Sequence, residues 1–511
     1  MGFFSGSNML RQGGIRQGSS VYFVGIKGTG VCALAELLHG AGMKTAGSDI
    51  PEVFHTDAIL RELGIPFHES FDWAHIGDDI DLVVHSAAYD ENNAEIAEAR
   101  RKSIPVATYP EALGAYSAGL DSTGVAGVHG KTTTTAMCGC LARALELPAQ
   151  VLAGSAVANF DGKSTLVLGG KYFIAETCEY RRHFLAFHPR RIILTSVESD
   201  HQDCFPSYES IRDAFVEYCR LIPPGGQLIY CADDSGAAEV AGIVERENRG
   251  VIPVPYGFSA KGDYGIDSYR ICRDASGDGM AAFRVNAFDG ELFLRVPGRH
   301  QARNAAAALA LAGVLLKDEF GTGWNPDRQN AAKKALEGFA GSKRRAEIVG
   351  NAGGIVFMDD YGHHPTAIRS TLEGLRNFYP SRRIVVSFMS HTYTRTAALL
   401  DGFADSLSGA DVLFLHKIYA SARERFDGDI DGMSLHEKIA GLRGGENAPL
   451  LRYVEEPMEA AEPLKELLKP GDLFLTLGAG NNWPLGVRLF EHFRALDRVG
   501  DQGIPSGEVS A

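Results

Sequence analysis

The segment GVAGVHGKTTTTAMCG, residues 124–139, constrains the possible folds of this chain more than any other. An apolar, strand-like run from Ser122 leads into a glycine turn, and a helix of small residues follows through Leu145. Backbone N–H groups in such a turn, at the start of a helix, favour bound anions. The segment therefore predicts a parallel α/β sheet with a phosphate-binding site at the end of this strand.

The match to the phosphate-loop pattern G-x-x-x-x-G-K-[ST] is partial. Gly130, Lys131 and Thr132 fit, but Val125 holds the first glycine position and Gly127 lies two residues later. We expect Lys131 to lie along the β- and γ-phosphates and a threonine hydroxyl to ligate Mg²⁺. Because a run of threonines disfavours a helix, something in the fold should compensate. The structural alternative is a tight turn before a buried helix.

Alternating strand and helix patterns divide the chain into three α/β blocks, as its 511 residues also suggest. The first block covers residues 19–120, the second 121–341 and the third 342–498. Between residues 264 and 296, short β-like pieces predict an antiparallel edge in the second block. We expect frayed polar tails at residues 1–18 and 500–511.

Composition excludes several classes of protein. With 64 acidic and 50 basic residues the net charge is -14, which argues against nucleic acid as a partner. No apolar run approaches the roughly 20 residues that span a bilayer, so we expect no membrane insertion. The start lacks both a secretory and a myristoylation signal. Eight cysteines show no pairing pattern, which is typical of buried, reduced thiols such as Cys32, Cys138 and Cys140 in the cytoplasm.

A second glycine turn, GIKGTG at residues 25–30, follows the first predicted strand. Its spacing is G-x-x-G-x-G rather than the dinucleotide pattern G-x-G-x-x-G, yet it opens a helix and could hold a diphosphate. Asp49 ends the next strand, where a ribose partner would lie. A dinucleotide-dependent oxidoreductase remains an alternative that depends on this turn alone.

Acids and histidines gather where strands end. AETCEY carries Glu176 and Glu179, and ESDHQD carries Glu198, Asp200 and His201. Because strand ends of a doubly wound sheet face the ligand crevice, a carboxylate and a histidine there suit a metal beside a triphosphate. The alternative is that both segments are solvated loops.

Two segments of the third block add further chemistry. MDDYGHHPTAI, residues 358–368, places two acids, a tyrosine and two histidines before Pro365, which is typical of a helix start. SHTYTR, residues 390–395, offers a histidine and an arginine that could hold a carboxylate or phosphate. An ordinary loop explains any one of these histidines, but the set favours a site.

Taken in order, GVHGKTTTT, AETCEY, ESDHQD, DYGHHPT and HTYTR resemble the motifs of the Mur ligase family over residues 19–495. The resemblance implies an N-terminal Rossmann-like domain that binds a UDP sugar, a central phosphate-loop ATPase domain and a C-terminal Rossmann-like domain. VYFVGIKGTG with the later GSD is similar to the branch that adds the first amino acid. That branch implies ATP-dependent joining of L-alanine to the lactyl carboxylate of UDP-N-acetylmuramate through an acyl phosphate.

The resemblance also implies roles for individual residues. ATP would be bound by Gly127, Val128, His129, Gly130, Lys131, Thr132, Thr133, Asn304, Arg345 and Asp360. Mg²⁺ would be held by Thr132, Glu176 and His201. The substrates would meet Gly28, Thr29, Gly30, Ser48, Asp49, Ser86 and Tyr361. The catalytic groups would be Lys131, His201, His363, His391 and Arg395, with His363 or His391 able to accept the proton of the amine.

The implied role is in cytoplasmic peptidoglycan synthesis, and thus in cell-wall biogenesis, cell shape and division, by a monomer or homodimer. Departures from the family pattern at Lys27, Gln301, Thr392 and Asn481 bear on substrate contacts more than on ATP use. Two alternatives stay open: a recycling ligase that attaches a whole tripeptide to the same sugar, and a non-catalytic nucleotide-sugar binder.

Overall fold

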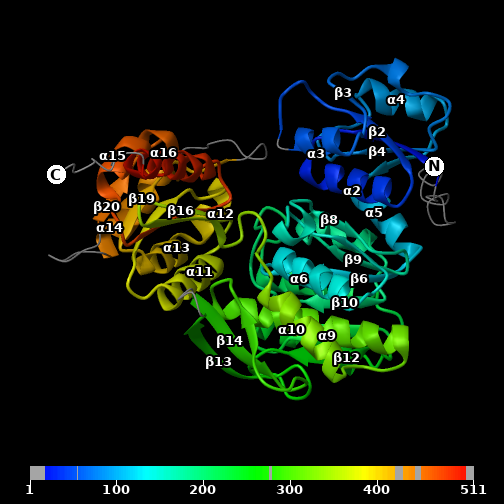
Figure 1. Ribbon diagram of the computed structural model, residues 1–511. Coiled ribbons are helices and arrows are strands. Elements are labelled where there is room, and N and C mark those ends of the chain that lie inside the picture. Colours follow the sequence, from blue (N-terminus) through cyan, green and yellow to red (C-terminus); the bar gives the residue numbers. More distant parts are fainter. Residues whose placement is uncertain (1–17, 55, 275–278, 421–429, 443–449, 502–511) are drawn as a thin grey trace, which may run out of the picture.

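The computed structural model of the chain describes residues 18–54, 56–274, 279–420, 430–442 and 450–501. Three α/β domains follow one another along the sequence, in blue, cyan to green, and yellow to red in Figure 1. This confirms the predicted fold class. Most of the two predicted tails lies outside the described residues. Among those described, no helix is both long and apolar enough to cross a bilayer.

The first domain is a parallel sheet of order β3-β2-β1-β4-β5 with helices beside it. Its register, with Val24 opposite both Ser48 and His85, brings the carboxyl ends of three strands to one edge. Its elements are β1 (Ser20–Val24), α2 (Thr29–Gly40), β2 (Lys44–Ser48), α3 (Thr56–Glu62), β3 (Phe67–His68), β4 (Leu82–His85), α4 (Ala94–Arg101), β5 (Val106–Thr108) and α5 (Tyr109–Ala118).

The middle domain has a seven-stranded sheet of order β12-β11-β10-β6-β9-β7-β8, parallel except for β8. The main strands and helices are β6 (Asp121–Ala126), α6 (Lys131–Ala144), β7 (Ala149–Leu152), β8 (Thr165–Val167), β9 (Tyr172–Glu176), β10 (Arg191–Leu194), α7 (Tyr208–Cys219), β11 (Gln227–Cys231), α8 (Ser235–Arg246), β12 (Ile252–Tyr256), α9 (Arg299–Phe320) and α10 (Pro326–Glu337).

The predicted antiparallel edge of the middle domain is a sheet of its own. β13 (Ile266–Arg273), β14 (Gly279–Val285) and β15 (Leu292–Leu294) pair with one another and not with the seven-stranded sheet. The prediction of antiparallel strands is therefore right, but their placement at an edge of the main sheet is wrong. Side-chain alternation gives strand character, whereas the choice of pairing partner depends on distant residues.

The C-terminal domain is a six-stranded sheet of order β16-β17-β21-β18-β19-β20, in which only β16 runs antiparallel. The main elements are β16 (Glu347–Ala352), β17 (Ile355–Asp360), α11 (Pro365–Phe378), β18 (Arg383–Phe388), α12 (Tyr393–Ala398), α13 (Leu400–Ser406), β19 (Val412–Leu415), α14 (Gly432–Leu442), β20 (Leu450–Tyr453), α15 (Ala461–Leu467), β21 (Asp472–Leu477) and α16 (Trp483–Asp501).

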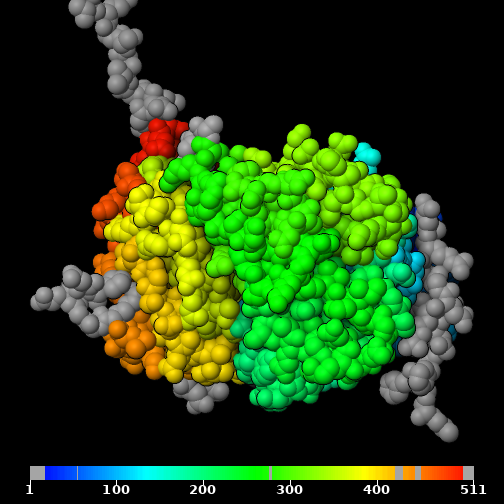
Figure 2. Space-filling view, turned by 90° about the horizontal axis from the view of Figure 1, so that it is seen from below, coloured from blue at the N-terminus to red at the C-terminus, as the bar shows by residue number. Residues whose placement is uncertain are grey.

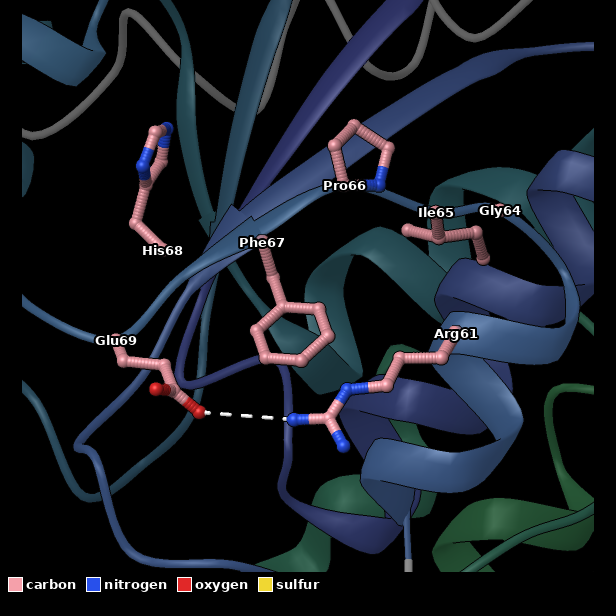
Figure 3. Close-up of a pocket in the computed structure, with 7 residues that line it drawn as sticks. All are labelled: Arg61, Gly64, Ile65, Pro66, Phe67, His68 and Glu69. Atoms are coloured by element: carbon pink, nitrogen blue, oxygen red, sulfur yellow. Dashed lines mark ion pairs between the residues drawn. The ribbon is translucent and has the colours of Figure 1, made fainter.

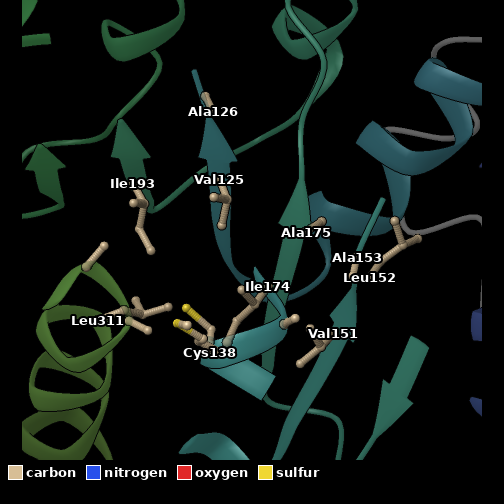
Figure 4. Packing of buried hydrophobic residues seen from close by; sticks show 14 of the residues in the cluster. Val125, Ala126, Cys138, Val151, Leu152, Ala153, Ile174, Ala175, Ile193 and Leu311 are labelled. Carbon is tan, nitrogen blue, oxygen red and sulfur yellow. The ribbon is translucent and has the colours of Figure 1, made fainter. Parts of the chain in front are cut away.

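One apolar core runs through the first two domains, from Val21 to Phe339, whereas the C-terminal sheet has separate cores on its two faces. Figure 4 shows the middle part of the shared core, where Cys138 of α6 and Leu311 of α9 pack against Ile193 of β10 and its neighbours. Cys32, Cys138 and Cys140 are buried free thiols, as predicted.

The middle and C-terminal domains adjoin along a continuous seam, which Figure 2 shows from below as green against yellow. α11 contacts α9 and β14 there. The approach is so close that a Cβ atom at Gly374 of α11 would lie 2.7 Å from the Cα atom of Gly298. Such a close approach of backbones needs glycine at position 374.

Candidate active site

The glycine turn after β6 needs its glycines. Gly127 has a φ of 135° and Gly130 a φ of 80°, values that side chains with a Cβ atom rarely adopt. A Cβ atom at Gly127 would also lie 2.1 Å from Thr195 Oγ1, and one at Gly130 would lie 2.8 Å from Asn304 Oδ1. Asn304, from the first turns of α9, thus lies directly against the loop at which the sequence predicts nucleotide binding.

Lys131 begins α6 and points its ammonium group back into the loop. Its Nζ atom donates to the Gly127 carbonyl and lies 3.0 Å from Glu179 Oε2. Burial opposes the charged form, but the carboxylates of Glu179 and Glu176 outweigh it and raise the pKa of Lys131. Lys131 is therefore protonated at neutral pH, with Glu179 as its buried counter-charge.

Two amides of the loop do not face the predicted phosphate site. Val128 donates its N–H to the Ser196 carbonyl over 3.1 Å, and His129 donates its N–H to Ser196 Oγ over 2.8 Å. The amides of the turn were predicted to bind an anion, and for these two residues the structure shows otherwise. Ser196 follows β10, so these bonds fix the loop to the neighbouring strand.

Thr132 and Glu176 meet beside the loop. The Thr132 hydroxyl donates to Glu176 Oε2 over 2.8 Å, and Arg345 Nη2 lies 3.5 Å from the same hydroxyl. A hydroxyl and a carboxylate are oxygen ligands of the kind that Mg²⁺ prefers, so this pair fits the predicted ion. His201 has Glu179 and Asp200 as its acidic neighbours in the described chain, at 3.4 and 3.8 Å, rather than Glu176.

A buried ion pair joins the two domains above the loop. Asp200 Oδ1 accepts a 2.8 Å hydrogen bond from Arg395 Nε and lies 2.8 Å from Nη2 in the same ion pair, and each side chain is only 4% exposed. Burial alone would raise the pKa of Asp200, but Arg395 and His201 hold it well below its usual range. The planar fork of Arg395, which the sequence suggested for a substrate carboxylate, therefore binds a carboxylate of the protein itself.

Two histidines of the C-terminal domain lie beside this pair. His391 Nδ1 accepts a 3.0 Å bond from Arg395 Nη1, whereas His363 Nδ1 faces the Tyr361 carbonyl at 2.9 Å and must donate to it. The two rings lie 5.8 Å apart. Burial, followed by the charge of Arg395, lowers the pKa of His363 well below its usual value. His363 is therefore neutral at pH 7, with its lone pair on Nε2.

The strand end at Asp360 organises the backbone around these groups. Asp360 is buried and accepts 2.7 Å bonds from the amides of Ala346 and Gly362, and burial raises its pKa. The ring of Tyr361 faces the guanidinium groups of Arg344 and Arg345, each 5.0 Å from the ring centre. The sequence singled out Arg345 but missed Arg344, which binds Asp359.

In the first domain, the predicted substrate residues differ in exposure. Gly28, Thr29 and Gly30 are exposed at the start of α2 and remain accessible. Ser48 is fully buried and donates its hydroxyl to Glu95 over 2.5 Å. A substrate cannot reach that hydroxyl without displacing Glu95.

Asp49 and Ser86 support the first glycine turn. Asp49 accepts bonds from the Lys27 amide at 2.7 Å and from the Tyr89 hydroxyl at 3.1 Å. Ser86 is half-buried and caps the Ala88 amide. Lys27, a departure from the family pattern, is fully buried with its ammonium group 3.2 Å from Asp57 Oδ2. Asp49 thus braces the turn instead of standing open for a ribose.

A cavity of about 600 Å³ opens beside β3 in the same domain. Figure 3 shows Arg61 and Glu69 pointing toward each other beside the ring of Phe67, with an ion-pair distance of 3.9 Å between them. The cavity is lined by Arg61 and by residues 64–69, and none of these is a predicted site residue. The cavity therefore does not mark the chemistry that the loop and the seam carry.

Sequence reasoning found most residues of the loop and the seam but missed the contacts between them. Asp200 was noted only as one acid of a segment, and its pairing with Arg395 had no signal in the sequence. The approach of His129, Glu198 and His364 was also missed, because the three lie in separate motifs. Strand-end position was the one available signal for Glu198.

Comparison with known proteins covers all three domains. Family models match residues 20–119 (Mur ligase family, catalytic domain), 125–312 (Mur ligase middle domain) and 344–480 (Mur ligase, glutamate ligase domain). UDP-N-acetylmuramate–L-alanine ligase of Treponema pallidum is 48% identical over 478 residues, 93% of this chain and 97% of that protein.

Solved structures agree in fold. The UDP-N-acetylmuramate–alanine ligase of Thermotoga maritima has a TM-score of 0.70 and 25% identity, with 93% of this chain and 99% of that one covered. A murein peptide ligase of Psychrobacter arcticus has a TM-score of 0.59 and 22% identity over the same shares. The second likeness concerns the fold alone.

Proposed function

The chain belongs to the Mur ligase family, and from this we propose that it joins L-alanine to the lactyl carboxylate of UDP-N-acetylmuramate while ATP is cleaved to ADP and phosphate. The observation that carries the ligase chemistry is the seam, where Arg345 of the C-terminal domain meets Thr132 of the loop and Arg395 binds Asp200 of the middle domain. The choice of alanine is supported by the 48% identity to an alanine-adding relative over nearly the whole chain.

The first step is attack of the lactyl carboxylate on the γ-phosphorus of ATP, which gives an acyl phosphate and releases ADP. Two anions must approach each other, so the site must supply positive charge. Lys131 offers its ammonium to the phosphates, and Arg345 lies beside Thr132 at the same place. Thr132 and Glu176 would hold Mg²⁺, which supplies further charge neutralisation when bound.

In the second step the amine of alanine attacks the acyl carbon and phosphate leaves. The amine must lose a proton, and His363 is better placed to accept it than His391. His363 presents its Nε2 lone pair, whereas Arg395 already occupies Nδ1 of His391. The lowered pKa makes His363 a weak base. We therefore assign it to accept the proton while the C–N bond forms, because the attacking nitrogen then becomes positively charged and much more acidic.

Closure of the seam serves the chemistry by excluding water, which would hydrolyse the acyl phosphate. Asp200 and Arg395 hold the two domains together at this point. The reaction belongs to peptidoglycan precursor synthesis, which we place in the cytoplasm. Its partners are then the nucleotide sugar and the amino acid, with no nucleic acid.

ADP release by the purified chain tests the proposal. Reactions would contain Mg-ATP and UDP-N-acetylmuramate with single amino acids or with the L-alanyl-γ-D-glutamyl-meso-diaminopimelate tripeptide. Release that requires both the sugar and L-alanine is the expected result. Release that requires the tripeptide would move the chain to the recycling ligases. Tight nucleotide binding without release under any condition would leave only a non-catalytic binder.

A further inference from the structure

Three side chains from separate segments converge where the middle domain meets the C-terminal domain. His129 precedes α6 and Glu198 follows β10, whereas His364 is the N-cap of α11. Figure 1 shows α11 in the C-terminal domain, across the seam from α6 and β10. One ligand atom of each lies within 4.8 Å of the others. We propose that this His–Glu–His cluster binds one divalent transition-metal ion of the Zn²⁺ class, which links the two domains.

The donor set selects the kind of ion. Two imidazoles and one carboxylate are a common set for Zn²⁺, with a fourth position left for water or another ligand. Mg²⁺ prefers oxygen ligands in octahedral geometry and retains its waters. The cluster is therefore chemically different from the Thr132–Glu176 pair, in which both groups offer oxygen.

His364 is oriented as a metal ligand would be. Its Nε2 atom faces the Ser199 carbonyl at 3.3 Å, which makes Nε2 the protonated nitrogen. Nδ1, 3.7 Å from Glu198 Oε2, then carries the lone pair, and its present partner is a long 3.3 Å bond from the Thr366 amide. Metal-binding histidines usually donate their second N–H to a carbonyl or carboxylate in this way.

His129 and Glu198 are held in place from outside the cluster. Ser196 Oγ fixes the backbone of His129, and the Thr366 hydroxyl donates to Glu198 Oε2 over 2.8 Å. His129 Nε2 is a buried nitrogen that lies against Glu198 Oε1 but makes no hydrogen bond to any described residue. Zn²⁺ would bind that nitrogen once the two atoms move apart to the separation that two ligands of one ion need.

The protonation states also suit an ion. Burial lowers the pKa of His364, so the ring is neutral at pH 7. Burial alone would raise the pKa of Glu198, but its histidine neighbours, His129 first and then His364, hold it low, so the carboxylate is ionised. Neutral imidazole and charged carboxylate are the forms that bind metals.

Because His364 comes from the C-terminal domain and the other two ligands from the middle domain, the ion would bind best when the domains are docked. Binding therefore favours the docked arrangement by mass action. The site would make domain closure sensitive to transition-metal concentration, independently of the nucleotide.

Co²⁺ is a suitable probe because it reports its own coordination. The full chain, stripped with a chelator and free of nucleotide, would be titrated with Co²⁺ and then with Zn²⁺. We expect one Co²⁺ per chain with the strong visible absorption of a four-coordinate site, displaced by Zn²⁺. Glu198→Gln and His364→Asn should each weaken binding by about 100-fold or more.

Two controls locate the ion. His492→Asn removes a histidine of α16 outside the cluster, and Glu176→Gln removes the carboxylate beside Thr132, so both should leave the Co²⁺ spectrum unchanged. Circular dichroism shows whether each variant is folded. One folded variant of the two, Glu198→Gln or His364→Asn, is enough to test whether the cluster binds Co²⁺. Unchanged Co²⁺ binding in a folded ligand variant, loss of the spectrum in Glu176→Gln, or no binding by the parent chain would overturn the proposal. No substrate is present, so the result is independent of the proposed ligase activity.

Discussion

Single residues at the site are buried together with their counter-charges. Lys131 and Glu179 illustrate this, since the side chain of Glu179 is 3% exposed and its nearest cation is the Lys131 ammonium. Burial alone would raise the pKa of Glu179, but Lys131 and His201 hold it low. Replacing either partner leaves a buried charge without compensation, which is more costly than losing an exposed pair.

Lys131→Ala should lower ADP formation by about 10³-fold or more, because the γ-phosphate loses its cationic partner. We also expect the free energy of unfolding to fall by about 3 kcal/mol as Glu179 is left unpaired. Coupled-enzyme assay and urea unfolding measure the two effects. Adding Glu179→Gln should recover stability but not activity. Near-parental turnover in the single variant would refute the loop assignment.

His363 and His391 form a matched pair for testing the proton acceptor. His363→Asn keeps a donor for the Tyr361 carbonyl but removes the basic nitrogen, so kcat should fall by about 10²-fold. His391→Asn keeps an acceptor for Arg395 and should cost much less. Steady-state rates at saturating alanine measure the difference. Equal losses, or a larger loss in His391→Asn, would remove His363 from the acceptor role.

His416 should make the C-terminal domain sensitive to acid. It is 2% exposed, its Nδ1 donates to the Val454 carbonyl, and its Nε2 accepts from the Ser387 hydroxyl, so the neutral ring is fully bonded. Burial lowers its pKa to about 4. Protons therefore bind the unfolded chain more readily between pH 6.5 and 4, and stability is lost as the pH falls through that window.

Between pH 7 and pH 5 we expect this ring to account for about 2 kcal/mol of lost unfolding free energy. Urea unfolding of the parent chain and of His416→Gln at both pH values measures it. The variant should show a shallower pH dependence. A dependence as steep as that of the parent would assign the acid sensitivity to other groups.

The chemistry at residue scale was partly readable from the sequence. Lys131, Thr132 and Glu176 follow from a loop pattern and from a strand end, both of which are local. The partners of Arg395 and Ser48 could not be predicted, because Asp200 and Glu95 lie far away in the chain. The hydrogen bond from Ser48 to Glu95 arises from tertiary packing and has no local signal in the sequence.

The surroundings of helix α6 explain why it tolerates a run of four threonines. The four threonines, residues 132–135, are all buried in the middle domain, so tertiary burial offsets their low helix propensity. Thr135 donates its hydroxyl to the Lys131 carbonyl one turn earlier, over 2.9 Å. Thr134 differs, since its buried hydroxyl has no partner among the described residues.

Thr134→Val and Thr135→Val should therefore act in opposite directions. Replacing the unpartnered hydroxyl with a methyl group should leave stability unchanged or raise it by about 1 kcal/mol, whereas Thr135→Val should lower it by about 1 kcal/mol. Unfolding midpoints in urea give both values, with helix content checked by circular dichroism. A loss of stability in Thr134→Val would show that its hydroxyl is satisfied after all.

At the scale of elements the sequence predicted types better than pairings. The segment PTAIRSTLEGLRNF coincides with α11, since Pro365 and the apolar period mark the helix clearly. Strands β6, β9 and β10 were recognisable because each contains a short apolar run, GVA in β6, FIA in β9 and IIL in β10. The three-stranded sheet β13-β14-β15 was misplaced because alternation carries no information about the partner strand.

At the scale of the whole molecule, the first two domains share one core, although the other face of the first sheet has a small apolar cluster of its own. Val21, Leu141 and Phe339 belong to one continuous core, whereas the cores of the C-terminal sheet hold only residues after 345. α2 of the first domain contacts β7 and β8 of the second. The three-domain plan was predictable from the order of motifs, but the sharing of a core was not. The boundaries 19–120, 121–341 and 342–498 stay predictions.

Calorimetry should therefore resolve two cooperative transitions rather than three, one for the first two domains and one for the C-terminal domain. A nucleotide that binds only the loop should raise the midpoint of the first of these units. Leu375→Ala, in a C-terminal core, should lower only the midpoint of the C-terminal transition. Three independent transitions, or a shift of both units by this change, would contradict the assignment.

The shared core also affects how the chain folds while the ribosome makes it. The last side chain of that core is Phe339, in the segment after α10. The first domain is complete in sequence near residue 120, yet the apolar side of α2 lacks its neighbours until β7 and β8 are translated, and the unit closes only with Phe339. At roughly 5–20 residues per second, apolar surface stays open for about 10–40 s. During that time the nascent chain depends on chaperones more than a chain of three self-contained domains would.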